Sequence, residues 1–389
     1  MDEDPLVGRT VAGCRVERPL GRGGMGAVYL ARDAAGAQVV VKVLAPEVAH
    51  DPAVRRRFAR EGDALRRLPP HPALVGLRAV EADAEPPAIV MDHVEGAALS
   101  RLSRAPARLA PAAAARAARD VATALAVVHA QGLLHRDVKP ANVIVRPDGG
   151  ATLVDFGVAR DAFRTALTRT GHMVGSTHYM APEQWQGAAL DARADLYGLG
   201  ATLYHALTGR PPCTGADPAE LMDRVLAGDV APPRALAPEV PLELERVVLQ
   251  LLSPDPRFRY ARAGDVAQDL EQVLAGGAAR YPCLVVAGAD ADERRIALLP
   301  GRRFTLGRDP GCEVALEHPT VSREHAQLRR EEGGWVLRDL RSSYGTRVGD
   351  ERLTGARALV HGDVVRVGDV RLRFDDPLTT ARAAGPNPA

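Results

Sequence analysis

The loop at residues 135–143, HRDVKPANV, holds an acid, a lysine and an amide at close spacing. Asp137 and Asn142 are five positions apart, Lys139 lies between them, and the apolar run VIV begins at the last residue of the loop. Phosphoryl transfer uses this set: a carboxylate orients and deprotonates the attacking hydroxyl, a lysine contacts the γ-phosphate, and an amide oxygen binds a metal ion. A structural loop gains little from these side chains beside apolar residues, so the spacing predicts phosphoryl-transfer chemistry.

A further acid follows at the end of the next strand-like run, LVDFG. Asp155 stands thirteen positions after Asn142. A carboxylate there is suited to bind Mg²⁺ (or Mn²⁺) that bridges the β- and γ-phosphates of ATP. The sequence therefore predicts a divalent metal site at Asp155.

A glycine hairpin is predicted at residues 20–31, LGRGGMGAVYLA. Gly21, Gly23 and Gly26 lie between two strand-like runs, so their backbone N–H groups can approach phosphate oxygens without obstruction by Cβ atoms. The pattern G-x-G-x-x-G alone is weak evidence, and its dinucleotide-binding form requires a helix directly after it. Here a strand follows, and Val28 completes the kinase form G-x-G-x-x-G-x-V.

One charge interrupts the apolar run VVVKVL at residues 39–44. Taken alone, Lys42 is best interpreted as a residue of an edge strand whose side chain extends into water. After a glycine hairpin, its better use is as a cation on the α- and β-phosphates. Glu61, on the helical run that follows, is the acid best placed to hold the ammonium, whereas its neighbours Arg60 and Asp63 fit a solvated face.

The elements that must position these residues follow a sheet-then-helix order. Residues 14–91 are mainly strand-like, with one helical run at 51–68 that has a single apolar face. Helical patterns dominate 99–274, including a run at 111–132 that begins on proline and ends at glycine. Short alternating strands then take over, with a hairpin turn at 368–369. The pattern predicts an α+β domain followed by an all-β domain.

Length and composition set limits on the protein class. The 389 residues suffice for two or three cores. Lys plus Arg number 50 and Asp plus Glu 49, so bulk charge favours neither nucleic acid nor an acidic membrane as partner. The four cysteines are far apart, which indicates neither a zinc site nor a disulfide framework and favours a reducing cytosol. No signal peptide or membrane span is expected.

Together, these motifs resemble those of eukaryotic-like serine/threonine protein kinases over residues 14–275. The resemblance implies a bilobal fold with an N-lobe at 14–91, a hinge at 92–96 and a C-lobe at 97–275. It also implies a role for each matched residue. In nucleotide binding, the residues that cover ATP are Gly21, Gly23, Gly26 and Val28, while Lys42 pairs with Glu61, Met91 is the gatekeeper and Val94 lies beside adenine in the hinge. In catalysis, Asp137 is the base, Lys139 contacts the γ-phosphate, and Asn142 and Asp155 hold the metal.

The same resemblance gives a place to the threonine-rich segment TALTRTGHMVGST at 165–177. It lies between DFG and APE, where this family keeps its activation loop. We expect autophosphorylation at Thr168 or Thr170, whose phosphate would bond to Arg136 and order the segment. Thr177 is expected to support the active site instead.

Two further pairings are implied in the helical lobe. Asp195 in DLYGLG is expected to anchor the catalytic loop. Arg259 is expected to pair with Glu183 of the APE motif and so brace the lobe.

The C-terminal region offers groups for a second phosphate site. The motifs FTLGRD, VSREHAQL and LRSSYGTRVG lie between alternating strands, and so fall on loops. Arg308, Ser322 and Arg323 supply planar donors and a hydroxyl, which suit a phosphate. Any one of these arginines alone fits ordinary surface charge.

With His325 and Thr346, these loops resemble a forkhead-associated (FHA) domain over residues 282–376. The resemblance implies a β-sandwich that binds phosphothreonine peptides through Arg308, Ser322, Arg323 and Thr346, with His325 as a structural brace. Tyr344 replaces the asparagine that usually precedes Gly-Thr and holds the peptide backbone, so either the affinity or the peptide preference is expected to differ.

The sequence thus predicts a cytoplasmic serine/threonine kinase that uses ATP and reads phosphothreonine on itself or on its substrates, with transient self-association through the phosphorylated loop. A linker is expected at 276–281 and a disordered tail at 377–389. One alternative is a pseudokinase scaffold that binds phosphoproteins. Another is a small-molecule phosphotransferase, against which the GSTHYMAPE segment argues because that segment forms a protein-substrate platform in kinases.

Overall fold

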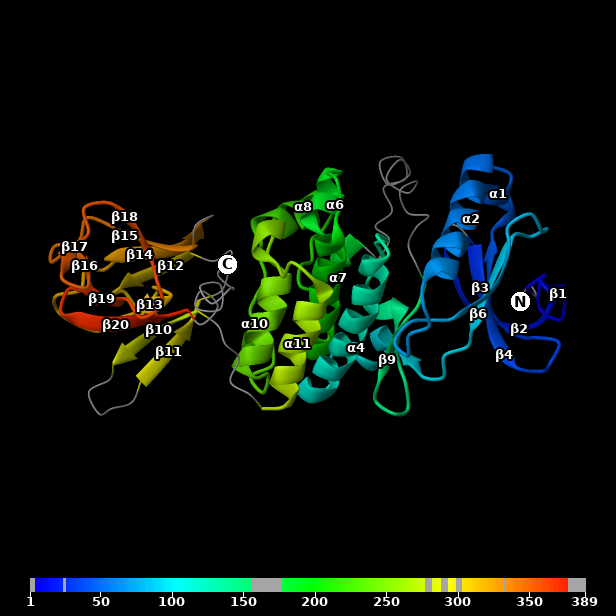
Figure 1. Ribbon diagram of the computed structural model, residues 1–389, viewed down its shortest axis with the longest axis horizontal. Coiled ribbons are helices and arrows are strands. Elements are labelled where there is room, and N and C mark those ends of the chain that lie inside the picture. Colours follow the sequence, from blue (N-terminus) through cyan, green and yellow to red (C-terminus); the bar gives the residue numbers. More distant parts are fainter. Residues whose placement is uncertain are drawn as a thin grey trace, which may run out of the picture. The chain divides into compact units, whose positions relative to one another are not determined.

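The computed structural model describes residues 4–23, 26–155, 177–276, 282–287, 293–298, 303–331 and 334–376. The chain divides into two compact units, 1–276 and 277–389. Figure 1 shows a sheet followed by helices in the first unit and only strands in the second. This order matches the sheet, helix and strand patterns of the sequence.

The first unit begins with a six-stranded antiparallel sheet in the order β1-β2-β3-β4-β6-β5. Val39, Val41 and Val43 pack on one face of the sheet, whereas Lys42 points to the other, since side chains alternate along a strand. The strands are β1 (Thr10–Val11), β2 (Cys14–Gly23), β3 (Gly26–Arg32), β4 (Gln38–Leu44), β5 (Leu77–Glu81) and β6 (Ala88–Asp92).

One long helix, α2 (Pro52–Arg67), packs against this sheet after the short α1 (Pro46–Ala49). Its N-cap Asp51 accepts a hydrogen bond from the backbone of Ala53 at 2.7 Å, and Pro52 occupies the first turn. Phe58 is 1% exposed and joins a core with Ile89 of the sheet. The apolar face expected at 51–68 is therefore confirmed.

A helical lobe completes the first unit, with α7 at its centre (Figure 1). All residues of α7 from Ala194 to Thr208 are buried, and α4 and α10 pack against it, while α11 packs against α4. The helices are α3 (Leu99–Leu102), α4 (Pro111–Ala130), α6 (Pro182–Gln186), α7 (Ala192–Thr208), α8 (Pro218–Ala227), α9 (Pro233–Leu236), α10 (Leu242–Leu251) and α11 (Ala263–Leu274).

A three-stranded sheet in this lobe positions the polar loop of the sequence analysis. It consists of β7 (Ala97–Ala98), β8 (Val143–Val145) and β9 (Ala151–Leu153). Val143 pairs with Leu153 in an antiparallel ladder, so the residues before β8 and after β9 meet at one end. The backbone N–H of Val154 donates to Asn142 O at 2.9 Å, which continues the pairing to the residue before Asp155.

The second unit is a sandwich of two sheets, with strand orders β11-β10-β20-β19-β16-β17 and β13-β12-β14-β15-β18. Its core includes Trp335 and Phe374, and the predicted hairpin turn at 368–369 joins β19 and β20. The strands are β10 (Cys283–Ala287), β11 (Glu293–Ala297), β12 (Arg303–Gly307), β13 (Val314–Ala315), β14 (Ala326–Glu331), β15 (Gly334–Asp339), β16 (Thr346–Val348), β17 (Glu351–Arg352), β18 (Ala356–Leu359), β19 (Val364–Val367) and β20 (Val370–Asp375).

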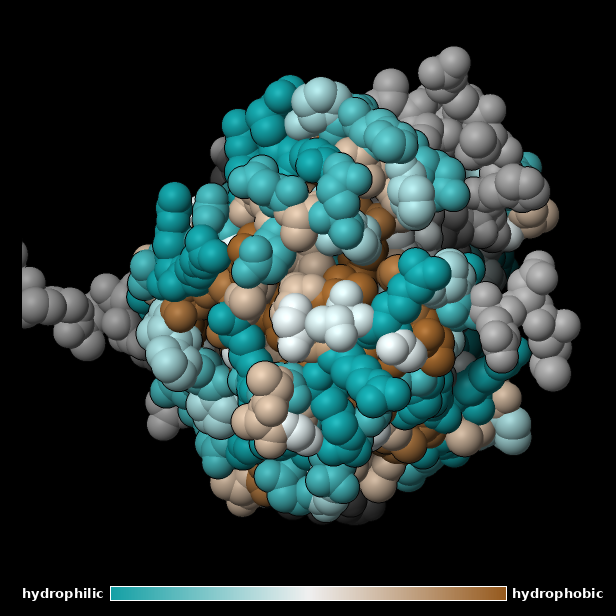
Figure 2. All heavy atoms as spheres, turned by 90° about the vertical axis from the view of Figure 1, so that its right-hand side faces the viewer, coloured by the Kyte–Doolittle hydropathy of each residue, from teal (hydrophilic) through white to brown (hydrophobic). Residues whose placement is uncertain are grey.

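Hydrophilic side chains cover most of the face that Figure 2 presents, and apolar residues show only in smaller areas between them. Among the residues described, no helix combines the length and apolar character needed to cross a membrane.

Candidate active site

The residues predicted to perform chemistry meet between the small sheet and the helical lobe. Lys42 Nζ of β4 lies 2.5 Å from Asp155 Oδ1 after β9. Lys139 Nζ lies 2.7 Å from Asp137 Oδ2, and Asn142 Nδ2 donates to the same oxygen at 3.1 Å. Asn142 Nδ2 also approaches Asp155 O at 3.4 Å, which connects the two groups. All five side chains therefore form one cluster.

Two residues of this cluster region have unusual backbone geometry. Arg136 has φ +65° and Asp155 has φ +61°, in the left-handed region that non-glycine residues seldom adopt. Such conformations cost of order 1–3 kcal/mol each and persist where surrounding contacts impose them. The strain lies directly beside Asp137 and at the predicted metal ligand.

Asp195 of α7 makes the contacts that hold Arg136 in this conformation, in the loop at 135–143 (the catalytic loop). Its carboxylate accepts hydrogen bonds from the backbone N–H groups of His135 at 2.8 Å and Arg136 at 2.6 Å, and lies 2.8 Å from His129 Nε2. Asp195 is 2% exposed. The predicted anchoring role of Asp195 is confirmed, while the contact with His129 was not foreseen.

The electrostatics of the cluster favour an ionised Asp155. Burial opposes ionisation of this carboxyl, but the adjacent Lys42 ammonium outweighs burial, so the pKa of Asp155 lies below its ordinary value; Lys139 contributes in the same direction. Complete burial lowers the pKa of His135 despite nearby carboxylates, so its ring is neutral at pH 7. Positive charge near Asp155 thus comes from the two lysines.

The donor set suits a hard divalent cation. Asp155 offers a carboxylate and Asn142 an amide oxygen, because its Nδ2 is engaged with Asp137. Within the described ranges, no group of three or more His, Cys, Asp or Glu could hold a metal ion by itself. Mg²⁺ is commonly held by one or two protein oxygens together with substrate phosphates, so the two residues fit that ion.

The glycine hairpin joins β2 to β3, with Gly21 opposite Val28 and Gly23 opposite Gly26. A Cβ added at Gly21 or Gly23 would meet no atom within 4 Å, whereas one at Gly26 would overlap the carbonyl of Val43. The first two glycines therefore leave open space where phosphates could approach, and Gly26 permits close packing of β3 against β4.

Val28 stands beside Lys42 in the sheet, and Met91 lies on β6 with 6% exposure. Val94 follows β6 and packs against the same apolar core as Met91.

Glu61 lies on α2, but its side chain is outside the described part of the structure, so its pairing with Lys42 stays a prediction. Thr168 and Thr170 also lie outside the described residues.

An interaction that sequence reasoning missed connects the hairpin to the N-terminal segment. The Asp4 carboxylate accepts hydrogen bonds from Arg22 Nη2 at 2.6 Å and from the Tyr29 hydroxyl at 3.1 Å. Arg22 lies on the hairpin arm between Gly21 and Gly23. Asp4 therefore ties the position of the glycine hairpin to the segment before β1.

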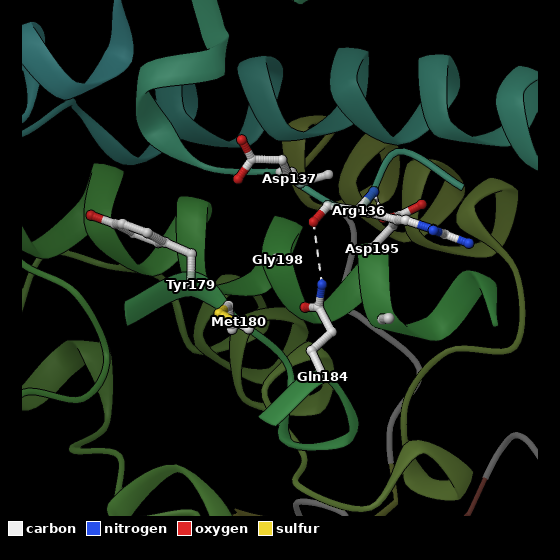
Figure 3. Close-up of a pocket in the computed structure, with 9 residues that line it drawn as sticks. Arg136, Asp137, Tyr179, Met180, Gln184, Asp195 and Gly198 are labelled. Atoms are coloured by element: carbon white, nitrogen blue, oxygen red, sulfur yellow. Dashed lines mark hydrogen bonds between the residues drawn. The ribbon is translucent and has the colours of Figure 1, made fainter. Parts of the chain in front are cut away.

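A small pocket opens beside Asp137 on the side of the APE motif (Figure 3). Its lining includes Arg136, Tyr179, Met180 and Gln184. Gln184 Nε2 donates to Arg136 O at 3.2 Å, and Gln184 Oε1 accepts from the backbone N–H of Ala181 at 2.9 Å. Gln184 thus links the segment at 177–183 to the catalytic loop.

Tyr179 contacts helix α7 through its side chain. Its hydroxyl lies 2.9 Å from His205 Nδ1, and the two rings are 5.9 Å apart between centroids. Burial raises the pKa of Tyr179 to about 12 and lowers the pKa of His205, so both are neutral at pH 7. Since α7 also carries Asp195, one rigid helix sets the distance between the catalytic loop and the Tyr179 segment.

For the phosphoryl transfer from ATP to protein that the sequence predicts, Tyr179→Phe is expected to raise KM for the protein substrate about threefold to tenfold and to leave KM for ATP unchanged. The substitution removes one hydrogen bond, worth about 1 kcal/mol, from a segment on the substrate side of Asp137. Steady-state kinetics with each substrate varied in turn measure the effect. Tyr204→Phe is the control, because Tyr204 is buried on the same helix and no hydrogen bond of its hydroxyl occurs in the part of the chain described. Equal KM values for both variants and the parent would contradict the expectation.

The predicted pair of Glu183 and Arg259 is confirmed. Arg259 Nη1 and Nη2 donate to the two Glu183 carboxylate oxygens at 2.6 and 2.9 Å. The Arg259 side chain is fully buried and lies over the Tyr197 ring at 5.0 Å. This bidentate pair fixes the APE motif to the loop before α11.

In the second unit, Arg308, Ser322 and Arg323 come together where β12 ends and β14 begins. The backbone N–H of Arg308 donates to Ser322 O at 2.8 Å, and Arg308 Nε donates to Val321 O at 3.3 Å. Ser322 Oγ accepts from the backbone N–H of Ser343 at 3.2 Å. Arg308 and Arg323 are exposed and Ser322 is half-buried, so all three residues are accessible at the surface of these loops.

His325 and Thr346 lie beneath this surface. His325 is fully buried, with Nδ1 accepting from Ser322 N at 3.1 Å and Nε2 lying 3.1 Å from Gly345 O, which confirms the expected bracing role. Thr346 is also fully buried, and its hydroxyl donates to Asp339 at 2.6 Å. Its side chain thus supports the loop rather than lying on the loop surface, unlike the other three residues expected to contact the peptide.

The first unit has the architecture of a protein kinase domain: a small antiparallel sheet joined to a helical lobe, with Lys42, Asp137, Asn142 and Asp155 gathered between them. The family model described as protein kinase domain matches residues 14–272, and that described as FHA domain matches residues 304–368. The chain therefore belongs to the protein kinase family and carries an FHA domain.

Individual relatives agree with the family models. The chain is 37% identical over 265 residues to a probable serine/threonine-protein kinase of Streptomyces coelicolor, covering 66% of this chain and 39% of the relative. It is 36% identical to the serine/threonine-protein kinase PknB of Mycobacterium leprae, covering 69% and 46%. The crystal structure of the Mycobacterium tuberculosis PknI kinase domain matches with a TM-score of 0.53 at 30% identity, covering 69% of this chain and 99% of that domain. The chain spans less than half the length of these two curated relatives.

Proposed function

We propose that this protein is a serine/threonine protein kinase that transfers the γ-phosphate of ATP to protein hydroxyls. The observation that carries the proposal is the cluster of Lys42, Asp137, Lys139, Asn142 and Asp155. Each supplies a group that phosphoryl transfer needs, and residues from two lobes converge to provide them.

The roles follow from position and charge. Asp137 orients the incoming hydroxyl and accepts its proton, since its carboxylate lies in the cluster with Lys139 and Asn142 and the residue lines the pocket beside the APE motif. Lys139, 2.7 Å from Asp137, is placed to contact the γ-phosphate, and Lys42 to contact the α- and β-phosphates. The open space at Gly21 and Gly23 admits phosphate oxygens to the backbone.

Asn142 and Asp155 would hold Mg²⁺ or Mn²⁺. When bound, such an ion neutralises charge on the transferring phosphate. Lys42 lies against Asp155 at 2.5 Å, and the low pKa of Asp155 keeps the carboxylate ionised for a cation at neutral pH. The hinge at 92–96, with Met91 and Val94, would receive adenine.

Two alternatives are less well supported. A pseudokinase scaffold has no need of the four phosphoryl-transfer groups, all of which are present and gathered here. A small-molecule phosphotransferase has no need of the segment at 177–183, which Gln184 and Arg259 fix next to Asp137. Proteins are therefore the favoured substrate class.

The purified protein incubated with Mg-ATP is expected to gain phosphate at Thr168 or Thr170 first. These threonines flank Arg169 between the DFG and APE motifs, and a phosphate there suits Arg136. Mass spectrometry of peptides with and without Mg-ATP measures the gain. Samples incubated with EDTA are the control. Absence of any metal-dependent phosphate on serine or threonine, in the protein or in an added protein substrate, would contradict the kinase proposal.

We further propose that the FHA domain reads phosphothreonine through Arg308, Ser322 and Arg323. Support comes from the two exposed guanidinium groups beside one hydroxyl on a surface braced by His325. Ligands on other proteins and on the chain's own phosphorylated segment both fit this proposal, the latter through transient self-association. A phosphothreonine peptide is expected to bind more tightly than its unphosphorylated form.

The remaining predictions concern organisation and location. We propose that residues 14–275 act as the catalytic domain and 282–376 as the reader, joined by a linker at 276–281. A cytoplasmic location accords with a need for ATP and with four cysteines that are all free.

A further inference from the structure

Four arginines lie in one row across the six-stranded sheet of the second unit. The strand registers pair Arg371 of β20 with Arg366 of β19, Arg366 with Arg347 of β16, and Arg347 with Arg352 of β17. Directly paired residues of neighbouring strands point to the same face. Figure 1 shows these four strands next to one another at one side of the sandwich.

The row faces solvent. Arg347, Arg352 and Arg371 are exposed and Arg366 is half-buried, while Val365, Val367 and Leu372 alternate with them and pack inward. The row is therefore the outer surface of the sheet.

Within the described residues of this unit, none of the four arginines of the row forms an ion pair with an acid. The nearby Asp375 pairs instead with Arg373 and Arg295, and Glu351 pairs with Arg357. Arg347 Nη2 donates to a backbone oxygen, that of Asp350, at 3.1 Å.

Such an arrangement is unfavourable for the isolated sheet, because like charges directly opposite one another destabilise a strand pair. The row contains three such pairs in succession. The chain as a whole is nearly neutral, with 50 basic and 49 acidic residues, so the row is a local concentration of charge. An anionic ligand lying along the row would relieve the repulsion.

The row adjoins the proposed phosphothreonine surface. The Arg352 guanidinium packs against Gly345, since a Cβ there would lie 2.7 Å from Arg352 Nε, and Gly345 is also held by His325. At the other end of the row, the β19–β20 turn contacts Thr320, whose hydroxyl accepts from the backbone N–H of Asp369 at 3.0 Å. Thr320 is two residues before Ser322.

We propose that the row of Arg371, Arg366, Arg347 and Arg352 binds acidic or phosphorylated residues that flank a phosphothreonine in a partner protein. This inference rests on the proposed reader function and names its ligand class. Strands lie about 4.8 Å apart, so the row spans roughly 14 Å, the length of about four extended residues. A peptide held at Arg308 and Arg323 can therefore place an adjacent acidic stretch along the row.

The charge pattern favours a partner over the chain's own threonine-rich segment. Residues 162–175 contain Arg164 and Arg169 and no acidic residue. Those flanks would add positive charge next to the row. A peptide segment is also favoured over a nucleic acid, because the row leads directly from a surface suited to a single phosphorylated side chain.

The test titrates the full chain, without ATP, with three fluorescent peptides in 0.15 M salt. One carries a phosphothreonine with aspartate and glutamate flanks, one the same phosphothreonine with asparagine and glutamine flanks, and one the acidic flanks with unmodified threonine. Parent protein is expected to bind the first peptide roughly fivefold to twentyfold more tightly than the second, as a few exposed ion pairs allow. The ratio of these two affinities is the quantity compared between variants, and raising the salt concentration is expected to reduce it.

Arg366→Gln with Arg371→Gln is expected to lower the ratio to below about twofold and to leave the affinity for the neutral-flanked phosphopeptide unchanged. Arg303→Gln with Arg338→Gln, which removes equal charge from exposed positions on the other sheet, is the control and is expected to keep the ratio. Thermal unfolding of each variant verifies that the fold is intact.

The outcomes distinguish the proposed role of the arginine row from the phosphothreonine binding on which it rests. An unchanged ratio in the Arg366/Arg371 variant overturns the inference while the reader function stands. Equal binding of phosphorylated and unmodified acidic peptides, or no loss of phosphopeptide binding on Arg308→Ala, overturns the reader function itself. Displacement of the acidic phosphopeptide by a duplex oligonucleotide at equal concentration would instead identify the row as a nucleic-acid surface.

Discussion

Asp137→Asn is expected to reduce phosphoryl transfer by about 10²- to 10⁴-fold while leaving ATP affinity within about twofold of the parent value. An amide has nearly the size of the carboxylate but cannot accept the proton of the attacking hydroxyl. ATP itself would be held by the glycine hairpin, Lys42 and the hinge, none of which the substitution changes. Transfer of labelled γ-phosphate to a protein substrate measures the first quantity, and titration with a fluorescent ATP analogue the second.

The control for this variant is Asp148→Asn. Asp148 is exposed in the turn between β8 and β9, where it pairs with Arg146, so the substitution removes the same charge from the same lobe. Its transfer rate is expected to equal that of the parent. If Asp137→Asn also retained the parent rate, Asp137 would not be the base and the proposed mechanism would be wrong.

The cluster at Asp137 could be predicted from sequence because its geometry is local. Asp137, Lys139 and Asn142 lie within six residues, and the short antiparallel pairing of β8 with β9 brings Asp155 to the same end. The helix α2 and the β19–β20 hairpin were predictable for the same reason, since caps, turn residues and alternating apolar positions act over a few residues.

Contacts between distant positions were not predictable in this way. His205 follows Asp195 on α7 without any local pattern that indicates Tyr179 as its partner, because the contact depends on where the segment before α6 returns to the helix. Asp4 and Arg22 are likewise distant in sequence, and the pairing of the first strands brings them together.

The arginine row is a clearer case of contacts that local sequence patterns do not predict. Along each strand, arginines alternate with buried apolar residues, as in any strand with one face in water. Only the registers of four strands, two of which are adjacent in space but not in sequence, place Arg366 beside Arg347. Burial of Thr346 under its loop is a further consequence of tertiary structure that a motif cannot reveal.

Glu183→Ala is expected to lower the free energy of unfolding of the first unit by about 3–5 kcal/mol, because it leaves the Arg259 guanidinium buried without its counter-ion. Arg259 is fully buried, so its guanidinium loses its charged partner in a site removed from solvent. Its remaining hydrogen bonds are to three backbone carbonyls, those of Ser253, Arg193 and Pro254. These neutral acceptors do not compensate the charge.

Urea unfolding followed by tryptophan fluorescence measures this loss. The chain has two tryptophans, Trp185 beside Glu183 and Trp335 in the second unit, so a Trp335→Phe background makes the signal specific to the first unit. Asp265→Ala is the matched control, since it breaks an exposed pair with Arg262 at 3.2 Å and is expected to cost less than about 1 kcal/mol. Glu183→Leu combined with Arg259→Met removes both charges and is expected to recover part of the loss, because no unpaired ion then stays buried. A loss for Glu183→Ala no larger than that for Asp265→Ala would show that the buried pair does not brace the lobe, and that α6 and the loop before α11 are held together by apolar packing alone.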